Sequence, residues 1–330
     1  TQLPKIADPP FQPYEFEKRP SIQVMNIGGD EVPRVIIDLS HLDSIAPANL
    51  KHCGHYYNDE LDKWATADAA ADFIYIGDTS LDFDLPGMVS VIQNSAAWNK
   101  TPQTYPLFNG NERKNTSAEL NFVLCSLGEL NETFKQALPV NTVLVLEAKT
   151  DHAMAEMRAA FLQLNMPIPV IMKRDFSDLD REHCRLYAST DFGGLLIDGF
   201  GDGIWLNSSQ DKDFVNQTAF GILQATRTRI SKTDYISCPS CGRTLFDLQE
   251  TTAMIRKRTD HLKGLKIGIM GCVVNGPGEM ADADYGYVGS GTGVISLYKG
   301  KEVVRKNIPA ENAVDELIDL IKEHRDWVDG

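Results

Sequence analysis

Three cysteines and one glutamate near the C-terminal end of the sequence have the types and spacing to hold an iron–sulfur cluster. Cys238 and Cys241 form a C-x-x-C motif, Cys272 stands in a second Gly-rich stretch, and Glu279 follows an Asn-Gly-Pro-Gly turn. Thiolates bind iron–sulfur iron well, and four Cys is the usual ligand set. With a carboxylate in the fourth place, one iron of a [4Fe–4S] cluster would have a labile oxygen ligand and could bind substrate. The pattern therefore favours an enzyme over an electron carrier.

Two other kinds of site stay open on spacing alone. A structural zinc site needs a closed tetrahedral set, typically a second C-x-x-C or a paired His motif. After Cys241 the sequence offers Cys272 and two histidines, His261 and His324, which are not in a paired spacing. A thioredoxin-like dithiol is the other alternative, and it needs no distant cysteine.

The residues around the cysteines resemble a known family. Residues 236–244 (ISCPSCGRT) and 270–279 (MGCVVNGPGE) are similar to the C-terminal domain of the 4-hydroxy-3-methylbut-2-enyl diphosphate synthases, and the similarity covers about 234–330. The resemblance implies a [4Fe–4S] cluster. Its metal ligands would be Cys238, Cys241, Cys272 and Glu279.

The same resemblance implies a reaction in the methylerythritol phosphate route to isoprenoids. It is the reductive opening and dehydroxylation of 2-C-methyl-D-erythritol 2,4-cyclodiphosphate to 4-hydroxy-3-methylbut-2-enyl diphosphate, with ferredoxin or flavodoxin as electron donor. Glu279 would be catalytic because it leaves the iron when substrate binds. Arg243 and Asn275, inside the two motifs, are expected to contact substrate or to surround the cluster. Equally, Arg243 would only offset cluster charge, and Asn275 would only shape the turn.

Functions of a different class remain as alternatives. The chain could be a non-catalytic iron–sulfur electron-transfer or scaffolding module in which Glu279 stays on the iron. A zinc-binding interaction domain is a third and weaker alternative.

Composition points to an intracellular protein with reduced thiols. The sequence has 330 residues, enough for two domains, and only 6 Cys. No apolar run approaches the roughly 20 residues of a membrane span, and no signal-peptide core is visible. The net charge of −14 disfavours nucleic acid and anionic membranes as partners. We expect a cytoplasmic bacterial protein, or a plastid stromal one if the source is a plant.

Residues 21–233 alternate short apolar runs with helical stretches, which predicts a barrel. Eight such runs over about 200 residues indicate a small (β/α)₈ barrel, with an open doubly wound sheet as the main alternative. Residues 1–20, rich in proline, read as an extended linker. The predicted strands are 22–27, 34–39, 73–76, 104–108, 120–125, 142–146, 168–172 and 194–197.

The family resemblance gives this barrel a place in a longer protein. Residues 193–206 are similar to the closing strands of the synthase's catalytic barrel, where a Gly-Asp pair leads into the last strand. The long, three-domain form of the synthase inserts a second barrel-like domain before the cluster domain, and this chain resembles that insert plus the cluster domain. The upstream catalytic barrel is then missing. Because 21–233 shows no set of Arg, Lys and Ser at strand ends, we expect the insert to be a spacer or scaffold and the fragment to be inactive alone.

Residues 234–330 are expected to form a small α/β sandwich around the cluster. The sequence predicts a helix over 244–259 whose N-terminus follows directly on Cys241, a strand over 265–270 that delivers Cys272, and a final helix with Pro309 in its first turn. A helix over 217–237 is expected to lead into Cys238. A basic stretch, 256–266, could steer an acidic electron donor, although a solvated helix face explains it better.

Two further features outside the cysteine motifs have a simpler explanation. Cys125, in an apolar run, is predicted to be a core residue. The sequence His52-Cys53-Gly54-His55 has metal-binding residue types but reads more readily as a polar loop or helix end.

Overall fold

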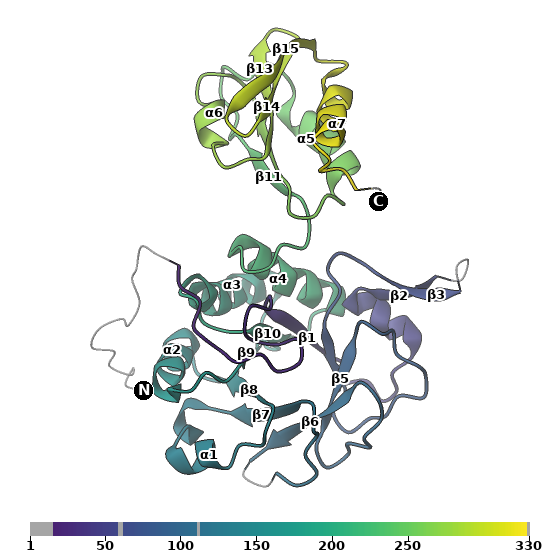
Figure 1. Cartoon of the computed structure of the whole chain (residues 1–330), viewed down its shortest axis with the longest axis vertical. Coiled ribbons are helices and arrows are strands. Elements are labelled where there is room, and N and C mark those ends of the chain that lie inside the picture. Colours follow the sequence, from purple (N-terminus) through teal and green to yellow (C-terminus); the bar gives the residue numbers. More distant parts are fainter. Residues whose placement is uncertain (1–15, 59–61, 111–112, 329–330) are drawn as a thin grey trace. The chain divides into compact units, whose positions relative to one another are not determined.

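The computed structural model describes residues 16–58, 62–110 and 113–328. The chain divides into two compact units, one ending at Arg229 and the other starting at Ile230 (Figure 1). Each unit has its own hydrophobic core. Of the predicted linker over 1–20, residues 1–15 lie outside the described residues.

The first unit is built around a closed barrel of eight parallel strands. The strands follow one another in the order β1-β10-β9-β8-β7-β6-β5-β4, and β4 pairs with β1 to close the ring. The predicted barrel-like fold is confirmed, and the open doubly wound sheet is excluded. The strands are β1 (Arg34–Asp38), β4 (Phe73–Tyr75), β5 (Ser90–Asn94), β6 (Thr104–Asn109), β7 (Asn121–Cys125), β8 (Thr142–Glu147), β9 (Val170–Asp175) and β10 (Gly203–Asn207).

Two of the eight predicted strands, 22–27 and 194–197, are wrong. Residues 194–197 are helical. The apolar run 194–197 forms the end of α3 (Arg181–Ile197), where Leu195 and Leu196 are buried. A Cβ at Gly194 would come 2.8 Å from the sulfur of Met154, so the glycine lets α3 approach its neighbouring helix closely. A short apolar run cannot be assigned to helix or strand by periodicity alone.

The other wrong strand, 22–27, packs with the barrel interior. Val24 and Ile27 exchange backbone hydrogen bonds of 2.8 and 3.0 Å across a tight turn, and both side chains belong to the core inside the ring. The ring is completed instead by β5 and β10. Strand β10 follows the Gly201-Asp202 pair, as the resemblance implies, but its first residue is Gly203 and it does not read as a long apolar run.

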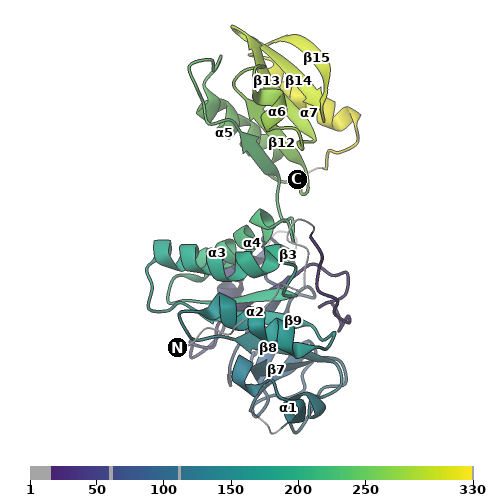
Figure 2. The ribbon, with the colours of Figure 1, turned by 90° about the vertical axis from the view of Figure 1, so that its left-hand side faces the viewer.

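Helices cover only part of this barrel. α2 (Ala153–Leu164), α3 and α4 (Lys212–Ala225) follow β8, β9 and β10 and pack side by side (Figures 1 and 2). The connections 76–89 and 95–103 carry no helix, so the alternation of strand and helix is incomplete. The remaining elements are α1 (Glu132–Gln136), the 3₁₀ helices η1 (Pro47–Cys53) and η2 (Leu127–Glu129), and the hairpin strands β2 (His55–Asn58) and β3 (Lys63–Thr66).

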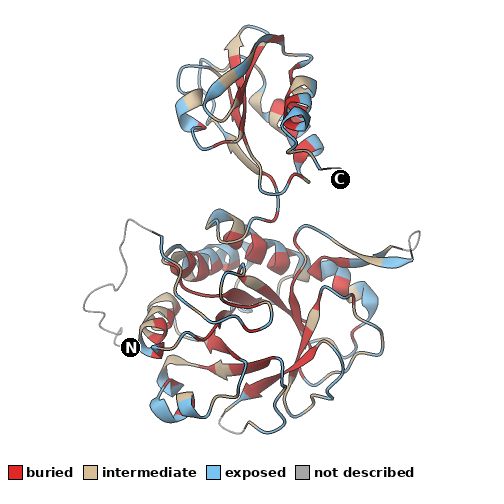
Figure 3. Cartoon of the chain, in the orientation of Figure 1, coloured by how far each residue is buried: buried red, intermediate tan, exposed pale blue. Residues whose placement is uncertain are grey.

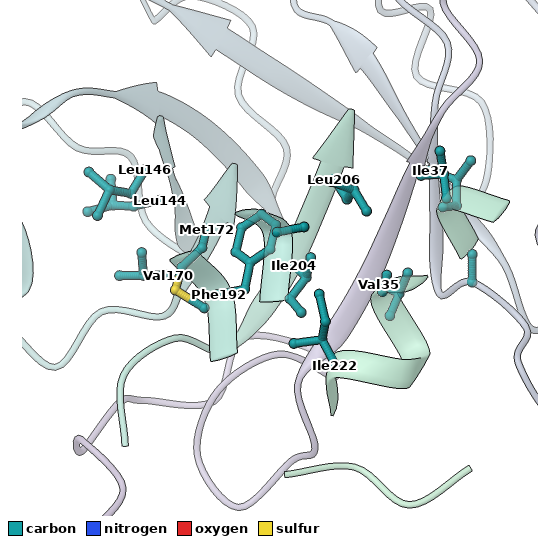
Figure 4. Packing of buried hydrophobic residues seen from close by; sticks show 14 of the residues in the cluster. Val35, Ile37, Leu144, Leu146, Val170, Met172, Phe192, Ile204, Leu206 and Ile222 are labelled. Carbon is teal, nitrogen blue, oxygen red and sulfur yellow. The ribbon is translucent and has the colours of Figure 1, made fainter. Parts of the chain in front are cut away.

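Two hydrophobic layers stabilise the barrel. Ile36 and Trp205 are fully buried inside the ring. Outside it, Val35 and its neighbours pack against Phe192 of α3 and Ile222 of α4 (Figure 4). Alternate residues of each strand serve the two layers, and the strands are buried along most of their length (Figure 3). This explains why most of the barrel strands read as continuous apolar runs.

The segments that lead into and out of the barrel are both fixed at its N-terminal end. The guanidinium of Arg19 donates to the carbonyl of Ile168, just before β9, at 3.0 Å. Arg229 donates to the carboxylate of Asp72, just before β4, at 2.5 and 3.2 Å. Arg229 also donates to the carbonyl of Pro33, just before β1, at 3.1 Å. The N-terminal ends of parallel strands share one end of a barrel, so these anchors do too.

The second unit is a five-stranded mixed sheet with helices on both faces, as the predicted sandwich requires. Its strand order is β11-β12-β13-β14-β15, parallel from β11 to β13 and antiparallel from β13 to β15. The elements are β11 (Asp234–Ser237), α5 (Leu248–Thr259), β12 (Lys266–Met270), α6 (Gly276–Glu279), β13 (Tyr285–Gly291), β14 (Val294–Lys299), β15 (Glu302–Pro309) and α7 (Ala313–Glu323).

Alternate residues of β12 divide the two faces of this sheet. Ile267 and Ile269 pack with α5 and α7 in one cluster. Met270 packs on the other face with Met280, the residue that follows α6. The sheet therefore holds the long helices on one side and the short helix α6 on the other.

Three predicted boundaries in this unit are wrong. α5 begins at Leu248, capped by Asp247, so its N-terminus does not follow directly on Cys241. Cys238 is reached through strand β11, because α4 ends at Ala225. Pro309 ends β15 and does not lie in the first turn of α7.

Candidate functional site

Cys238 and Cys272 lie at the C-terminal ends of two neighbouring parallel strands. Cys238 follows β11 directly, and Cys272 follows β12 after Gly271. The backbone N–H of Cys238 donates to the carbonyl of Ile269 at 3.2 Å, which continues the pairing of the strands up to the first cysteine. Two residues far apart in the sequence are thus brought to one edge of the sheet.

Gly271 links the two cysteine-bearing loops. Its N–H donates to the Sγ of Cys238 at 3.2 Å, and its carbonyl accepts from the N–H of Leu245 at 3.1 Å. A Cβ at this position would lie 2.8 Å from the side chain of Thr244. Only glycine lets the backbone approach the thiol and the Thr244 loop at once.

The loop of the C-x-x-C motif is a tight turn closed by Thr244. Ser240 adopts a left-handed conformation with φ of 62°. The hydroxyl of Thr244 accepts from the N–H of Cys241 at 3.1 Å, and the N–H of Thr244 donates to the carbonyl of Cys241 at 2.9 Å. These bonds hold Cys241 on the surface, where its thiol is exposed.

Arg243 brings three of the predicted ligands into one electrostatic environment. Its backbone N–H and its guanidinium both bind the Cys241 thiolate and lower the pKa of that thiol. The same guanidinium interacts electrostatically with Cys272 and Glu279. A low-pKa, exposed thiol beside an arginine is typical of a reactive or metal-binding cysteine.

Glu279 is presented by the single turn of α6. The carbonyl of Asn275 accepts the N–H groups of both Gly278 and Glu279 at 3.0 Å, whereas the Asn275 side chain makes no capping hydrogen bond. Asn275 thus shapes the turn through its backbone. Its side chain and the Glu279 carboxylate are both exposed.

The residues present fit an iron–sulfur cluster by donor chemistry. Three thiols and a carboxylate lie on two loops that Gly271 and Arg243 tie together, and soft thiolates suit iron. Over 16–58, 62–110 and 113–328, no group of three or more His, Cys, Asp and Glu is arranged to hold a metal ion. The four predicted ligands lie in one region of this unit, and their side chains do not converge on a coordination geometry.

Residues around these four were not singled out from the sequence. Thr244 and Gly271 stand inside the two motifs and Met280 directly follows the second, and the sequence assigned none of them a role at the site. Leu245, Val273 and Val274 form an exposed apolar rim, with 36%, 44% and 60% of their surface accessible. The sequence signal for this rim is the pair of consecutive valines directly after Cys272, because two adjacent apolar residues do not follow the alternation of a half-buried strand.

The His-Cys-Gly-His sequence at 52–55 is not a metal site. His55 is buried, and its Nε2 donates to the carbonyl of Ala71 at 2.7 Å. The Nδ1 of His52 lies 2.8 Å from the carboxylate of Asp213. Burial raises the pKa of the Cys53 thiol to about 12, so it stays protonated. Cys125 is likewise buried, which confirms it as a core residue.

The C-terminal mouth of the barrel carries paired polar groups. Lys173 lies 3.0 Å from the carboxylate of Glu147 and 4.7 Å from the ring centre of Trp205. Nearby, the hydroxyl of Tyr75 donates to Asn94 at 2.8 Å. Lys173 and Glu147 pair with each other, as do Tyr75 and Asn94, whereas the buried Nε1 of Trp205 has no hydrogen-bond partner among the described residues.

The basic stretch is partly neutralised and lies away from the cysteines. Arg258 pairs with Asp315, and Lys266 lies 3.3 Å from Asp282. Lys266 begins the strand whose other end leads to Cys272. The stretch is therefore a helix end and a strand start, not a rim around the thiols. In the part of the chain that the structure describes, no helix is long and apolar enough to cross a membrane.

Comparison with known proteins agrees with this geometry. Residues 234–323 match the family model described as the GcpE protein C-terminal domain. The chain is 45% identical over 329 residues to 4-hydroxy-3-methylbut-2-en-1-yl diphosphate synthase (flavodoxin) of Parabacteroides distasonis, covering 97% of this chain and 51% of that protein. The synthase of the same name from Bacteroides fragilis is 40% identical over 335 residues, which cover 98% of this chain and 50% of that protein.

A plant relative matches a shorter part. The chain is 52% identical over 180 residues to 4-hydroxy-3-methylbut-2-en-1-yl diphosphate synthase (ferredoxin), chloroplastic, of Arabidopsis thaliana, covering 54% of this chain and 24% of that protein. The chain spans about half the length of the bacterial relatives that it matches over nearly its whole length. On this likeness, the chain belongs to the family of the 4-hydroxy-3-methylbut-2-en-1-yl diphosphate synthases.

Proposed function

We propose that residues 234–330 form a domain that holds a [4Fe–4S] cluster through Cys238, Cys241, Cys272 and Glu279. The observation that carries this proposal is the link between the two cysteine loops. Gly271, next to Cys272, donates to the thiol of Cys238, and the Arg243 guanidinium interacts electrostatically with Cys241, Cys272 and Glu279. Backbone N–H groups aimed at sulfur are a common feature of iron–sulfur sites.

Each side chain has a separate task in this proposal. The cluster, when bound, supplies one-electron transfer and a Lewis-acidic iron. Glu279 would be the one oxygen donor of the set, and its exposed carboxylate would be the most labile of the four ligands. Arg243 offsets the negative charge of the thiolates, and as an exposed cation in the same electrostatic environment as Glu279 it would attract an anionic substrate group. Asn275 keeps the turn in shape.

The whole protein then carries out the reductive step of the family. We propose that it converts 2-C-methyl-D-erythritol 2,4-cyclodiphosphate into 4-hydroxy-3-methylbut-2-enyl diphosphate, with flavodoxin or ferredoxin as electron donor. The donors named for the relatives support this. In this proposal residues 21–233 are the inserted barrel, preceded by the linker 1–20, and an upstream catalytic barrel supplies the diphosphate site. A cytoplasmic location, or the stroma in a plant, fits the same reading.

Anaerobic reconstitution tests the first step. The purified chain is incubated with ferrous iron and sulfide under reducing conditions, and iron, sulfide and zinc are then counted per chain alongside an electronic spectrum. Four irons with a cluster spectrum support the proposal. Tight zinc binding that iron does not displace would favour the interaction-domain alternative. A cluster spectrum that the cyclodiphosphate leaves unchanged, in the full-length protein, would favour the electron-transfer alternative.

A further inference from the structure

Met280, directly after Glu279, is seated between two glycines that face each other across the sheet. Gly268 of β12 pairs with Gly286 of β13. A Cβ at Gly268 would lie 2.7 Å from the Cβ of Met280, and a Cβ at Gly286 would lie 2.6 Å from its sulfur. Met280 is 1% exposed. We call this space the Gly268–Gly286 notch.

The notch is specific for a side chain that lies flat on the sheet. Glycine inside a strand weakens it, and a common reason for its presence is the close approach of another group. Here that group is an unbranched, flexible thioether, which fits irregular gaps well. Met280 also packs with Met270, Val288 and Tyr298, so it is a true core residue of this face.

The notch holds the C-terminal end of α6, the end that carries Glu279. The helix is one turn long, and the N–H of Met280 donates to the carbonyl of Gly276 at 3.0 Å. At its start, a Cβ on Gly276 would come 2.6 Å from the Cβ of Met270. The turn is thus pressed onto the sheet at both ends. Glu279 itself is exposed, and the Arg243 guanidinium interacts electrostatically with its carboxylate.

We propose that Met280, seated in the Gly268–Gly286 notch, is the positioning residue that holds the Glu279 carboxylate at the fourth iron. This inference rests on the proposed function, since it assumes that Glu279 is a ligand. Cys241 stands in the Thr244 turn and Cys272 follows Gly271, outside the cluster that contains Met280, whereas Cys238 packs against that cluster. Because Met280 adjoins Glu279 in the chain, shortening Met280 should loosen Glu279 more than the three cysteines.

The experiment compares Met280→Ala, Met280→Leu, Glu279→Ala and a matched core control, Leu317→Ala. Leu317 is fully buried in α7, on the opposite face of the sheet. Each full-length chain is reconstituted anaerobically and treated with a limiting oxidant. Loss of the fourth iron is followed by iron counts and by the paramagnetic signal of a three-iron cluster.

We expect Met280→Ala to lose the fourth iron several-fold faster than wild type, approaching Glu279→Ala. Leu317→Ala should lose it at the wild-type rate, and Met280→Leu should be partly rescued because it restores volume. Met280→Ala that keeps its fourth iron as long as wild type would overturn the proposal. Equal acceleration in Leu317→Ala would overturn it too, because general destabilisation would then explain the effect.

Hydrogen exchange of the metal-free chain separates this inference from the proposed function. The amides of Glu279 and Met280 donate to Asn275 and Gly276. Met280→Ala should speed exchange at these two amides and leave the amides of β14 unchanged. If the wild-type chain takes up no iron, the cluster assignment fails while this readout still tests the seating of α6. Unchanged exchange at both amides would overturn the role of Met280.

Discussion

The backbone N–H of Gly271 donates a 3.2 Å hydrogen bond to the Sγ of Cys238. The donor immediately precedes one predicted ligand and the acceptor is another, 34 residues earlier in the sequence than Cys272. One backbone group therefore sets the spacing of two sulfurs. A hydrogen bond to thiolate sulfur also tunes the electronic properties of a bound cluster.

Replacing Gly271 by alanine should separate the two loops. The new Cβ would meet Thr244 at 2.8 Å, and relieving such overpacking costs about 1–3 kcal/mol of unfolding free energy. We expect lower stability of the metal-free domain in urea and lower iron uptake. Gly278→Ala is the matched control, since a Cβ there meets nothing within 4 Å. Equal effects of the two substitutions would contradict the role of Gly271.

The ligand set predicts an unequal response to substitution. Cys238→Ser, Cys241→Ser and Cys272→Ser should each abolish assembly of a four-iron cluster, because hard oxygen replaces soft sulfur. Glu279→Ala should leave a cluster that is weakened or sensitive to oxygen. Iron counts and electronic spectra after anaerobic reconstitution measure both. A Cys272→Ser chain with four irons and an unchanged spectrum would show the assignment to be wrong.

The hydroxyl of Thr244 should matter more than its methyl group for the Cys241 turn. Thr244→Val removes the acceptor of the Cys241 N–H and should cost about 1 kcal/mol. Thr244→Ser keeps the hydroxyl and should cost less. Urea unfolding and the alkylation rate of Cys241 in the metal-free chain check this. If serine is as damaging as valine, packing against Gly271 is the dominant contribution.

Acid should destabilise the barrel through His55. Burial lowers the pKa of this histidine, while its bond to the Ala71 carbonyl and the charge of Asp72 oppose the shift. The Nδ1 is buried without a partner among the described residues, so an added proton would find no acceptor. Because the folded pKa lies below the unfolded value of about 6.5, this stabilisation is complete above that pH and is lost as pH falls.

Urea unfolding near pH 7.5 and near pH 5.5 measures the effect. We expect the stability of the barrel to fall on acidification in wild type and to fall less in His55→Gln. The exposed His152→Gln should keep the wild-type pH dependence. The same pH dependence in all three proteins would remove His55 as the cause.

The chain alone should not turn over the cyclodiphosphate, even with cluster and reductant present. The described barrel mouth holds Lys173 paired with Glu147, which leaves its charge compensated. We expect activity only when the catalytic barrel of the longer protein is supplied. The measurement is product formation by residues 1–330 beside the full-length enzyme. Robust turnover by the shorter chain would place the substrate site within it.

The sequence predicts the fold correctly where burial alone determines both the residue pattern and the secondary structure. β1, β4 and β8 were found because a strand buried on both faces must be apolar throughout. For the cysteine motifs, thiolate chemistry alone left zinc and a redox dithiol open, and the iron–sulfur prediction rests on the family resemblance. Arg243 was expected beside the predicted ligands because it stands inside the first motif, and its guanidinium binds Cys241.

The errors arose where tertiary contacts decided the outcome. Residues 194–197 are apolar in either a strand or a helix, and in the structure they end α3, where Gly194 packs closely against Met154. The start of α5 was set too early because the Thr244 turn uses the residues after Cys241 for backbone bonds to that cysteine. The packing role of Met280 was missed because it depends on Gly268 and Gly286 being neighbours in the sheet. The sequence does not show that these two glycines pair.

Arg19 and Arg229 are more than 200 residues apart, and both donate hydrogen bonds to the backbone at the N-terminal end of the barrel strands. A module whose two ends emerge at one pole can be spliced into a chain, or cut out of it, with a short bridge across the gap. The chain neither enters nor leaves the barrel at the opposite, C-terminal end of the strands. Loops at that end can therefore change without altering how the barrel is joined to the rest of the chain. Such a barrel can be exchanged in evolution, or in the laboratory, as a single cassette.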